Sequence, residues 1–403
     1  MDQVPGTPSL LRAINDRTAL QLLSEQGPLT RARLGALTGL SKPTATQLMD
    51  RLEAAGLVEA LTGEGRTARL YRVRPGAAYV AGIDVTPANI RVRVCDLTGQ
   101  NVAQTTLPTP RREVKDALDR IREALTEACA AAGITVPQLN RVVIGLGGAP
   151  DPQSGRLGYA RHLPGWHDPN LLARLRTELT AAGEADPAVE IENDVNLAAV
   201  AEQSLGVTRK GSPLACRDFA VLWIGEGIGA AVIIDGRLHR GFTGGAGEIG
   251  YMPVAGQPPV RNISRGTNGG FQNLAGAPAV LRLARSKGFP GSDAAAALRR
   301  AAAAGPAGTE LLAEVADRLA VGLAPLVAVL DPELIVLTGA MLQAGGEALR
   351  ELVANSLYEM VIPRPRLVLS GVAQDPVLTG AIESALAQTK QELFDNTRKG
   401  RGL

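Results

Sequence analysis

The first 75 residues combine periodic apolar segments with turn-forming residues, a pattern typical of a small helical domain. A helix over about residues 8 to 26 is followed by a second, short helix that Thr30 can cap. Thr38-Gly39-Leu40 predicts a turn, and Ser41 can cap a third helix that tolerates Pro43 in its first turn. Three helices joined in this way predict a helix-turn-helix, with the third as the recognition helix.

The predicted recognition helix has an apolar face and a polar face. Ala45, Leu48, Leu52 and Ala55 recur at helical spacing and should pack on the domain core. On the other side we expect hydroxyl and amide groups to contact base edges in the major groove, while Lys42 and Arg51 reach phosphates. The predicted DNA-binding residues of this helix are Ser41, Lys42, Thr44, Thr46, Gln47 and Arg51.

A two-stranded wing follows the recognition helix. Two strand-like runs, 57–61 and 68–73, flank the turn 62–65, and Arg66 and Arg69 lie at the tip. Arginines at that place are suited to a narrow, electronegative minor groove. A small helical interaction module is the alternative, but it does not require the turn, cap and wing at this spacing. The sequence therefore predicts a winged helix-turn-helix domain over residues 1–75, with double-stranded operator DNA as its partner.

Charge and composition support this picture modestly. Residues 1–75 hold ten Lys or Arg against seven Asp or Glu, whereas the rest of the chain holds 32 against 33. No apolar run has the length of a membrane span and no signal peptide is evident, so we expect a cytoplasmic protein without a membrane partner. Cys95, Cys129 and Cys216 are few and widely spaced, which favours buried thiols over disulfides.

Beyond the composition shift near Arg74-Pro75-Gly76, strand and helix patterns alternate through the rest of the chain. Strands are predicted at 79–85, 90–96, 102–107, 141–146, 189–193, 219–224, 229–235, 333–338 and 366–370. Helices are predicted at 112–132, 168–182, 195–205, 294–304, 308–330, 343–359 and 376–391. This order predicts an α/β domain over residues 76–403, built of two related lobes with a cleft between them.

Several motifs in the second domain resemble the ROK family of repressors, open reading frames and sugar kinases. They are IGLGGAPDPQSG (144–155), LPGW (163–166), IENDVNLAAVAE (191–202), GEGIGAAVIIDGRL (225–238), GGAGEIGY (244–251) and DPELIVLTGA (331–340). The resemblance spans nearly the whole chain in the family's order. It implies an actin-like, sugar-kinase type (ribonuclease H-like) fold behind the winged helix-turn-helix. A homodimer or homotetramer would present two recognition helices to a two-fold related operator.

The nucleotide loops differ from those of the family's kinases, which place Gly-Gly-Thr-Lys after the aspartate of the first strand. Here Asp84-Val85 is followed by Thr86–Asn89, in which Pro87 has no N–H and no residue is basic. In the second phosphate segment, Glu226 places a carboxylate where the kinases have a hydroxyl. Thr338-Gly339-Ala340, near the adenosine position, is a milder change. We therefore expect no ATP and no enzyme activity.

The family's zinc site is also altered. Tyr251 takes the place of a zinc-binding histidine, and residues 253–275 contain no cysteine. His162, His167 and His239 are scattered along the sequence, which favours structural histidines over a substitute metal site. We expect no zinc and no other metal.

The sugar-contact positions implied by the resemblance are partly retained. The expected ligand-binding residues are His162, Asn193, Asp194, Glu248, Tyr251 and Gln272. Asn193, Asp194 and Glu248 match the family's hydroxyl-binding set, whereas the other three differ, so the usual sugar need not be the ligand. Asp194 holds the position of the kinase general base, and without ATP it could still accept a hydroxyl hydrogen bond. Its alternative role is the N-cap of the following helix.

These patterns predict a DNA-binding transcriptional regulator, a repressor, whose non-kinase cleft senses a carbohydrate or related metabolite. Two other hypotheses belong to different classes. One is a sugar kinase with an accessory helix-turn-helix, and the other is a DNA-binding regulator without ligand control. Ligand binding and phosphate transfer distinguish the three.

Overall fold

The N-terminal segment folds as a winged helix-turn-helix. The computed structural model describes residues 8–61, 69–109, 116–151, 157–158, 170–180, 187–225, 227–261 and 270–396. The first elements are α1 (Pro8–Gln26), β1 (Leu29–Thr30), α2 (Arg31–Thr38), α3 (Lys42–Ala54), β2 (Val58–Leu61) and β3 (Leu70–Val73). The wing strands pair antiparallel in the order β1-β3-β2. The two-residue strand β1 was not predicted, and the wing turn 62–65 and Arg66 lie outside the described residues.

Capping side chains fix the two helices of the motif. The Thr30 hydroxyl accepts the Arg33 N–H at 3.1 Å, and the Ser41 hydroxyl accepts the Thr44 N–H at 3.4 Å, as predicted. Gly39 ends α2 with φ +70°, a left-handed conformation that glycine adopts without a steric penalty. The apolar face of α3 is buried as expected, with Ala45, Leu48 and Leu52 each at most 1% exposed, and Ala55 is partly buried against the same core.

The second domain begins with a five-stranded mixed sheet, which forms the first lobe. Its elements are η1 (Pro75–Ala77), β4 (Tyr79–Val85), β5 (Asn89–Asp96), β6 (Asn101–Pro108), α4 (Ala117–Ala131), η2 (Val136–Gln138), β7 (Leu139–Leu146), β8 (Ala149–Pro150), β9 (Leu157–Gly158), α5 (Leu171–Thr180) and β10 (Ala188–Asn193). The strand order is β10-β7-β4-β5-β6. The pairs β4-β5 and β5-β6 are antiparallel, and β4-β7 and β7-β10 are parallel.

The second lobe repeats this topology. Its elements are α6 (Asp194–Ser204), β11 (Phe219–Ile224), β12 (Ile228–Ile234), β13 (Arg237–Leu238), η3 (Ile249–Tyr251), α7 (Gly270–Ala275), α8 (Ala277–Ser286), α9 (Ala294–Ala303), α10 (Pro306–Leu330), β14 (Leu334–Thr338), α11 (Ala340–Met360) and β15 (Arg366–Leu369). The order β13-β12-β11-β14-β15 has the same succession of antiparallel and parallel pairs as the first sheet. The prediction of two related α/β lobes is confirmed, although α7, α8 and β13 were missed.

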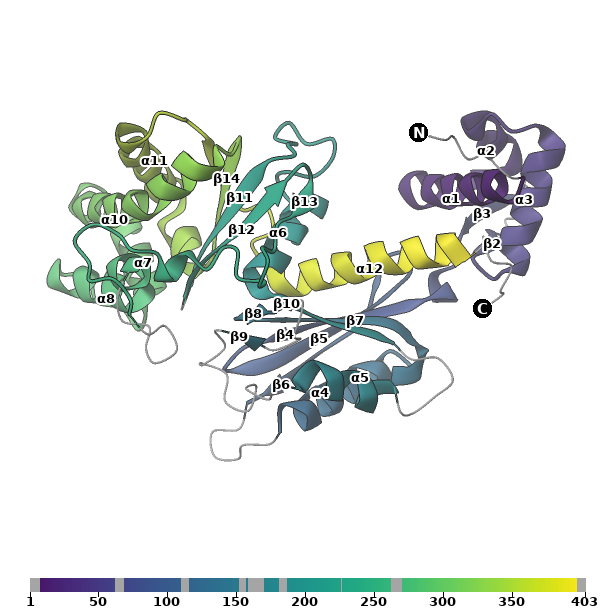
Figure 1. The fold of residues 1–403 in the computed structure, drawn as a ribbon, viewed down its shortest axis with the longest axis horizontal. Helices are drawn as coiled ribbons and strands as arrows, with labels where there is room; N and C mark the ends of the chain where they lie inside the picture. Colours follow the sequence, from purple (N-terminus) through teal and green to yellow (C-terminus); the bar gives the residue numbers. More distant parts are fainter. Residues whose placement is uncertain are drawn as a thin grey trace.

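The last helix, α12 (Pro376–Asn396), returns to the first lobe. It covers one face of the first sheet, and α4 and α5 cover the opposite face (Figure 1). Val377, Ala381 and Leu386 of α12 pack with Val80 and Val143 of that sheet. The chain thus passes from the second lobe back to the first through residues 370–375.

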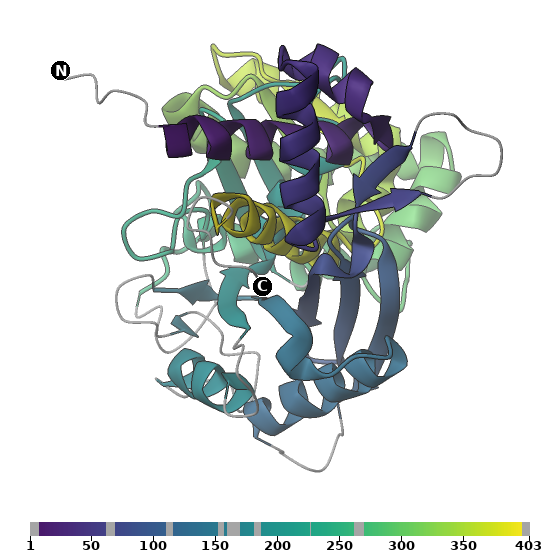
Figure 2. The same cartoon turned by 90° about the vertical axis from the view of Figure 1, so that its right-hand side faces the viewer.

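The far end of α12 packs against the winged helix. Leu393 is 7% exposed and belongs to the same apolar cluster as Leu20, Leu48 and Tyr71. Viewed from the winged-helix side, α12 (yellow) lies nearly end-on behind α1 and α3 (Figure 2). A helix over 376–391 was predicted, but its contact with the N-terminal domain was not. None of the helices in the described residues is long and apolar enough to cross a membrane.

Candidate DNA interface and carboxylate site

The recognition helix α3 presents polar side chains on its free face. Ser41, Lys42, Thr44 and Gln47 are exposed, and Thr46 is half-buried. Among the described residues, the side chains of Lys42 and Gln47 form no hydrogen bond or ion pair. Their donors and acceptors are therefore available to a base edge or phosphate.

Arg51, predicted to reach phosphates, makes a contact that sequence reasoning did not anticipate. Its Nη2 lies 2.6 Å from the Asp16 carboxylate on α1. Burial raises the pKa of Asp16, and the Arg51 hydrogen bond and charge oppose that rise. This ion pair joins α1 to α3. In this structure Arg51 therefore fixes the recognition helix within its domain, and its role toward DNA stays a prediction.

Two arginines, one from the wing and one from α2, lie over the Tyr71 ring of the wing. Arg69 forms an ion pair with Glu53 at 3.2 Å, and its guanidinium lies 5.5 Å from the Tyr71 ring centre. Arg31, at the start of α2, lies 4.9 Å from the same centre and pairs with Asp50 at 2.7 Å. Sequence reasoning missed Arg31, because only the fold brings α2 next to the wing. These contacts orient both side chains at the edge of the predicted DNA face.

The candidate ligand site begins where strand β10 meets helix α6. Asn193 caps α6, because its Oδ1 accepts the N–H groups of Val195 and Asn196 at 2.8 and 3.0 Å. The alternative role considered for Asp194, helix N-cap, is therefore wrong: Asp194 is the first helical residue. The Asn193 side-chain amide Nδ2 donates a hydrogen bond to the Gly148 carbonyl at 3.0 Å. Asn193 thus links β10, α6 and the segment after β7.

Asp194 and Glu248 form the carboxylate site together with Asn193. Burial raises the pKa of Asp194 to about 6, and the neighbouring Asp84 charge adds to the rise. Burial likewise raises the pKa of Glu248 to about 7, with a contribution from the charge of Asp194. The structure therefore brings together two predicted ligand residues that are 54 positions apart in sequence, from 194 to 248.

Close backbone packing positions Glu248. Gly247 has φ +93°, and a Cβ at this position would lie 1.9 Å from the Ala230 carbonyl oxygen. The Ala230 N–H donates to the Gly247 carbonyl at 2.8 Å. Only glycine permits this approach, which holds the segment before η3 against β12 and directs Glu248 toward α6.

An ion pair that was not predicted ties the Glu248 segment to the first lobe. Arg240 Nε lies 2.6 Å from Glu192, the residue before Asn193. The other Glu192 oxygen accepts the Asn196 amide at 2.9 Å. This pair helps to set the distance between the two halves of the carboxylate site. In the sequence, only the acidic residue Glu192 before Asn193-Asp194 indicated such a pair. Its basic partner Arg240 can be identified only from the three-dimensional structure.

The remaining predicted ligand residues have different surroundings. Gln272 Oε1 accepts the Ile228 N–H at 2.9 Å, so this oxygen supports the backbone at the start of β12. Tyr251 is half-buried at the end of η3. His162 lies outside the described residues. The ligand-binding roles of all three stay predictions.

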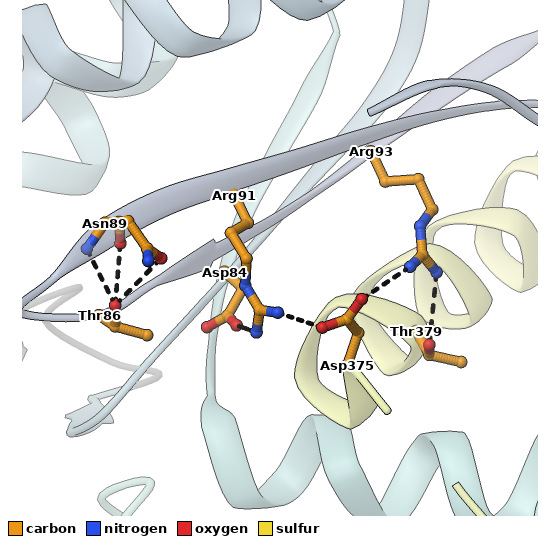
Figure 3. Close-up of polar contacts among 7 residues, drawn as sticks. All are labelled: Asp84, Thr86, Asn89, Arg91, Arg93, Asp375 and Thr379. Carbon is orange, nitrogen blue, oxygen red and sulfur yellow. Dashed lines mark hydrogen bonds and ion pairs between the residues drawn. The ribbon is translucent and has the colours of Figure 1, made fainter. Parts of the chain in front are cut away.

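The altered turn between β4 and β5 satisfies its own polar groups. The Thr86 hydroxyl accepts the Asn89 N–H at 3.1 Å and donates to the Asn89 carbonyl at 3.1 Å, while the Thr86 N–H donates to the same carbonyl at 2.9 Å (Figure 3). These internal bonds use the Thr86 hydroxyl and the N–H groups of Thr86 and Asn89, which could otherwise contact a phosphate. Glu226, the second altered position, lies outside the described residues.

No group of three or more His, Cys, Asp or Glu side chains within the described ranges is arranged to hold a metal ion. Tyr251 offers a phenol where the family's zinc site needs a histidine. The expectation that the chain binds no zinc stays a prediction.

Two of the cysteines are buried thiols. Burial raises the pKa of Cys95 and of Cys129 to about 11, which is typical of unreactive structural thiols.

A winged helix-turn-helix fused to a two-lobed α/β domain defines a class of DNA-binding proteins. The sequence profile of the ROK family matches residues 80–389, and that of the MarR family matches residues 15–67. The chain therefore belongs to the ROK family and carries a MarR-type winged helix-turn-helix at its N-terminus.

Characterised relatives agree with this assignment. The xylose repressor of Caldicellulosiruptor bescii is 25% identical over 406 residues, which cover 95% of this chain and 98% of that protein. A ROK family transcriptional regulator described as a homologue of the Escherichia coli MLC protein shares the fold, with a TM-score of 0.73 and 20% identity over 97% of this chain and all of that one. A ROK hexokinase from Thermus thermophilus matches 78% of this chain and 99% of its own, with a TM-score of 0.62 and 26% identity.

Proposed function

We propose that this protein is a DNA-binding transcriptional repressor whose carboxylate site binds a carbohydrate or related metabolite, and that it transfers no phosphate. The observation that carries the proposal is the packing of α12. Its first half covers the sheet that leads to Asn193 and Asp194, and Leu393 near its end completes the winged-helix core. A change at the carboxylate site thus has a packed route to the recognition helix.

The chemistry of the carboxylate site favours an uncharged ligand rich in hydroxyl groups. One oxygen of Asp194 accepts the Val195 N–H at 2.9 Å, and no side-chain donor contacts this carboxylate among the described residues. Asn193 retains one amide N–H beyond its bond to Gly148. Acceptors and a donor in one site suit the alternating hydroxyls of a sugar, whereas an anion would be repelled by the Asp194 carboxylate and by Glu248 when it is ionised.

The absence of phosphate transfer is supported by the turn at Thr86–Asn89. The Thr86 hydroxyl and the N–H groups of Thr86 and Asn89 form bonds within the turn, and Pro87 has no N–H to offer. A sugar kinase with an accessory helix-turn-helix is the alternative, and the similarity to the Thermus thermophilus hexokinase supports testing it. Incubation with ATP and a sugar panel distinguishes the two, since a kinase would consume ATP only when its sugar is present.

The mechanism we infer is a homodimer, or a dimer of dimers, that presents two α3 helices to a two-fold related operator. A carbohydrate that draws Asp194 and Glu248 together would shift α6, whose Leu197 packs with Val377 and Ala381 of α12, and α12 would transmit that shift. The ligand must bind the DNA-competent and DNA-incompetent states with different affinities, because equal affinity would not change their populations.

The decisive experiment measures binding of the purified protein to DNA upstream of its own gene, at one fixed salt concentration, with a panel of sugars and sugar phosphates. The proposal expects one sugar to change the affinity. Asp194→Ala should abolish this response while operator affinity without sugar stays nearly intact. Asp194→Asn is the matched control for shape, because it keeps the volume but loses the charge. An unchanged response in both variants would refute the assignment of the carboxylate site.

A further inference from the structure

Arg91 of strand β5 lies between two carboxylates that come from different parts of the fold. Its Nη2 donates to Asp84 on strand β4, and its Nη1 donates to Asp375, just before α12 (Figure 3). Asp375 is held in the left-handed region, with φ +46°, at the point where the chain returns from the second lobe to the first. The guanidinium therefore bridges the sheet of the first lobe and the segment that connects the lobes.

This bridge is sheltered from solvent. The side chains of Asp84, Arg91 and Asp375 are 4%, 27% and 28% exposed. A carboxylate as buried as Asp84 requires a positive partner, since a buried charge without one is strongly destabilising. Burial raises the pKa of Asp84, and the Arg91 hydrogen bond and charge oppose that rise. Asp194 feels the charge of Asp84, so the bridge adjoins the carboxylate site.

A second arginine on the same strand has a different role. Arg93 lies two residues further along, on the same face of β5, and contacts Asp375 and Thr379 at 3.4 Å each. It also donates to Gln104 at 3.0 Å. It makes no bond to Asp84. The neutralisation of Asp84 therefore depends on Arg91 alone among the charged groups that contact it in the described residues.

Two carboxylates that converge from separate elements are also what a divalent cation uses, with water completing its coordination. A metal ion exchanges with solvent and carries phosphate ligands with it. A guanidinium is tethered, always charged and fixed in a planar fork that suits two carboxylates at once. The same pair of aspartates can thus serve either cation, but not both together.

We propose that Arg91 is a built-in counter-cation that determines the ligand class of this site: it occupies the place of a divalent metal ion between Asp84 and Asp375 and thereby excludes metal-bound phosphate ligands. The inference rests on the proposed function, because it explains how the domain accepts an uncharged carbohydrate without a nucleotide. It also assigns Arg91 a positioning role, since the bridge fixes the start of α12.

The test is a titration of the full-length protein with Mn²⁺, in which electron paramagnetic resonance counts the free ion. Arg91→Ala should gain one Mn²⁺ site that binds about 10-fold or more tightly than any site in the unmodified protein. Adding Asp84→Asn to that variant should remove the site. Arg91→Lys keeps the charge and should gain none, and Arg93→Ala is the matched control that leaves Asp84 neutralised.

The outcomes separate this inference from the proposed function. Equal Mn²⁺ binding by Arg91→Ala and Arg93→Ala would overturn the role of Arg91, as would a site in the unmodified protein that Asp84→Asn abolishes. Neither result involves DNA or sugar, so the operator assay stands independently. A protein that shows the expected Mn²⁺ pattern but no sugar-dependent DNA binding would instead lose its proposed function.

Removal of Arg91 leaves a buried carboxylate unpaired, so Arg91→Ala could fail to fold. A double-mutant cycle covers that case with Asp84→Asn, Arg91→Met and the double variant. If Arg91 serves as the counter-cation of Asp84, the double variant should be more stable than Arg91→Met alone. Additive losses of stability in the double variant would overturn the proposal without any metal measurement.

Discussion

Truncation of Leu393 to alanine tests whether α12 connects the two domains. Leu393 is 7% exposed and completes the apolar cluster formed by Leu20, Leu48 and Tyr71 of the winged helix. Leu393→Ala removes part of that contact while every residue of α3 and of the carboxylate site stays unchanged. The winged helix should then be held less firmly against the first lobe.

The size of the effect follows from the packing. Leucine-to-alanine changes in protein cores cost about 2 to 5 kcal/mol, and the loss grows with the cavity that remains. Leu393 lies within the last turn of α12, which ends at Asn396, where neighbouring side chains can relax into the space. We therefore expect the lower part of the range, about 2 to 3 kcal/mol, lost from the packing of the winged helix on α12.

Leu393→Ala should weaken operator binding more strongly than it destabilises either domain by itself. Two recognition helices in one oligomer bind cooperatively only if their spacing is fixed, and loss of that geometry removes the gain from simultaneous binding. Operator affinity should fall by about 10-fold or more, measured by fluorescence anisotropy at fixed salt. Hydrogen exchange should increase in α1 and α3 but not in α4.

Leu386→Ala is the matched control. Leu386 is 3% exposed on the same helix but packs with the first sheet, next to Val80 and Cys95. It should destabilise the first lobe to a similar extent and leave operator affinity nearly unchanged. Equal losses of operator affinity in the two variants, or no loss in Leu393→Ala, would refute the role of α12.

Further predictions concern the DNA face, the acid groups and the connection between lobes. Gln47→Ala should relax the sequence preference and lose about 1 to 3 kcal/mol of discrimination at one base position. Arg69→Ala should weaken binding to all sequences and reduce the dependence of affinity on salt concentration. Identical effects of the two variants on a panel of DNA sequences would contradict this assignment of base and phosphate contacts. Burial raises the pKa of Asp194 to about 6 and of Glu248 to about 7, so the folded state binds extra protons and its unfolding free energy from these groups should fall as the pH rises from about 4 to 7. Denaturant unfolding should show a flatter pH dependence in Asp194→Asn, and an unchanged slope would argue against the raised pKa. Glu202→Gln should loosen residues 370–372. The buried Glu202 carboxylate accepts the Ser370 hydroxyl and the N–H groups of Gly371 and Val372, as well as the Val207 N–H after α6. Hydrogen exchange of the amides in 370–372 should therefore become faster, and unchanged protection would contradict this prediction.

Local features of the fold were predictable where a residue's role depends on its neighbours in sequence. The Thr30 and Ser41 caps, the turn at Gly39 and the buried face of α3 follow from spacing alone. The strand and helix order of the two lobes was likewise predictable. The helices α7 and α8 were missed: α7 has only 6 residues, and α8 begins directly after Gly276 with Pro278 in its first turn, which resembles a loop signal.

Contacts between distant segments depended on the tertiary structure. The ion pair of Arg51 with Asp16 was not predicted, because the packing of α1 brings together residues that lie 35 positions apart. The phosphate contact predicted for Arg51 stays a prediction. One local feature was also assigned wrongly: helix capping, the alternative role considered for Asp194, belongs to Asn193, whose backbone is extended as a cap requires.

The amino-acid sequence by itself determined the family and the winged helix-turn-helix, and it predicted a set of residues that bind hydroxyl groups. These depend on short motifs and on hydrophobic periodicity, which are properties of contiguous residues. Only the tertiary structure decided that Arg91 bridges Asp84 and Asp375, that Asp194 and Glu248 share one site, and that α12 joins this domain to the winged helix. Each of these contacts exists because packing brings together groups from separate elements, and packing is a property of the whole chain.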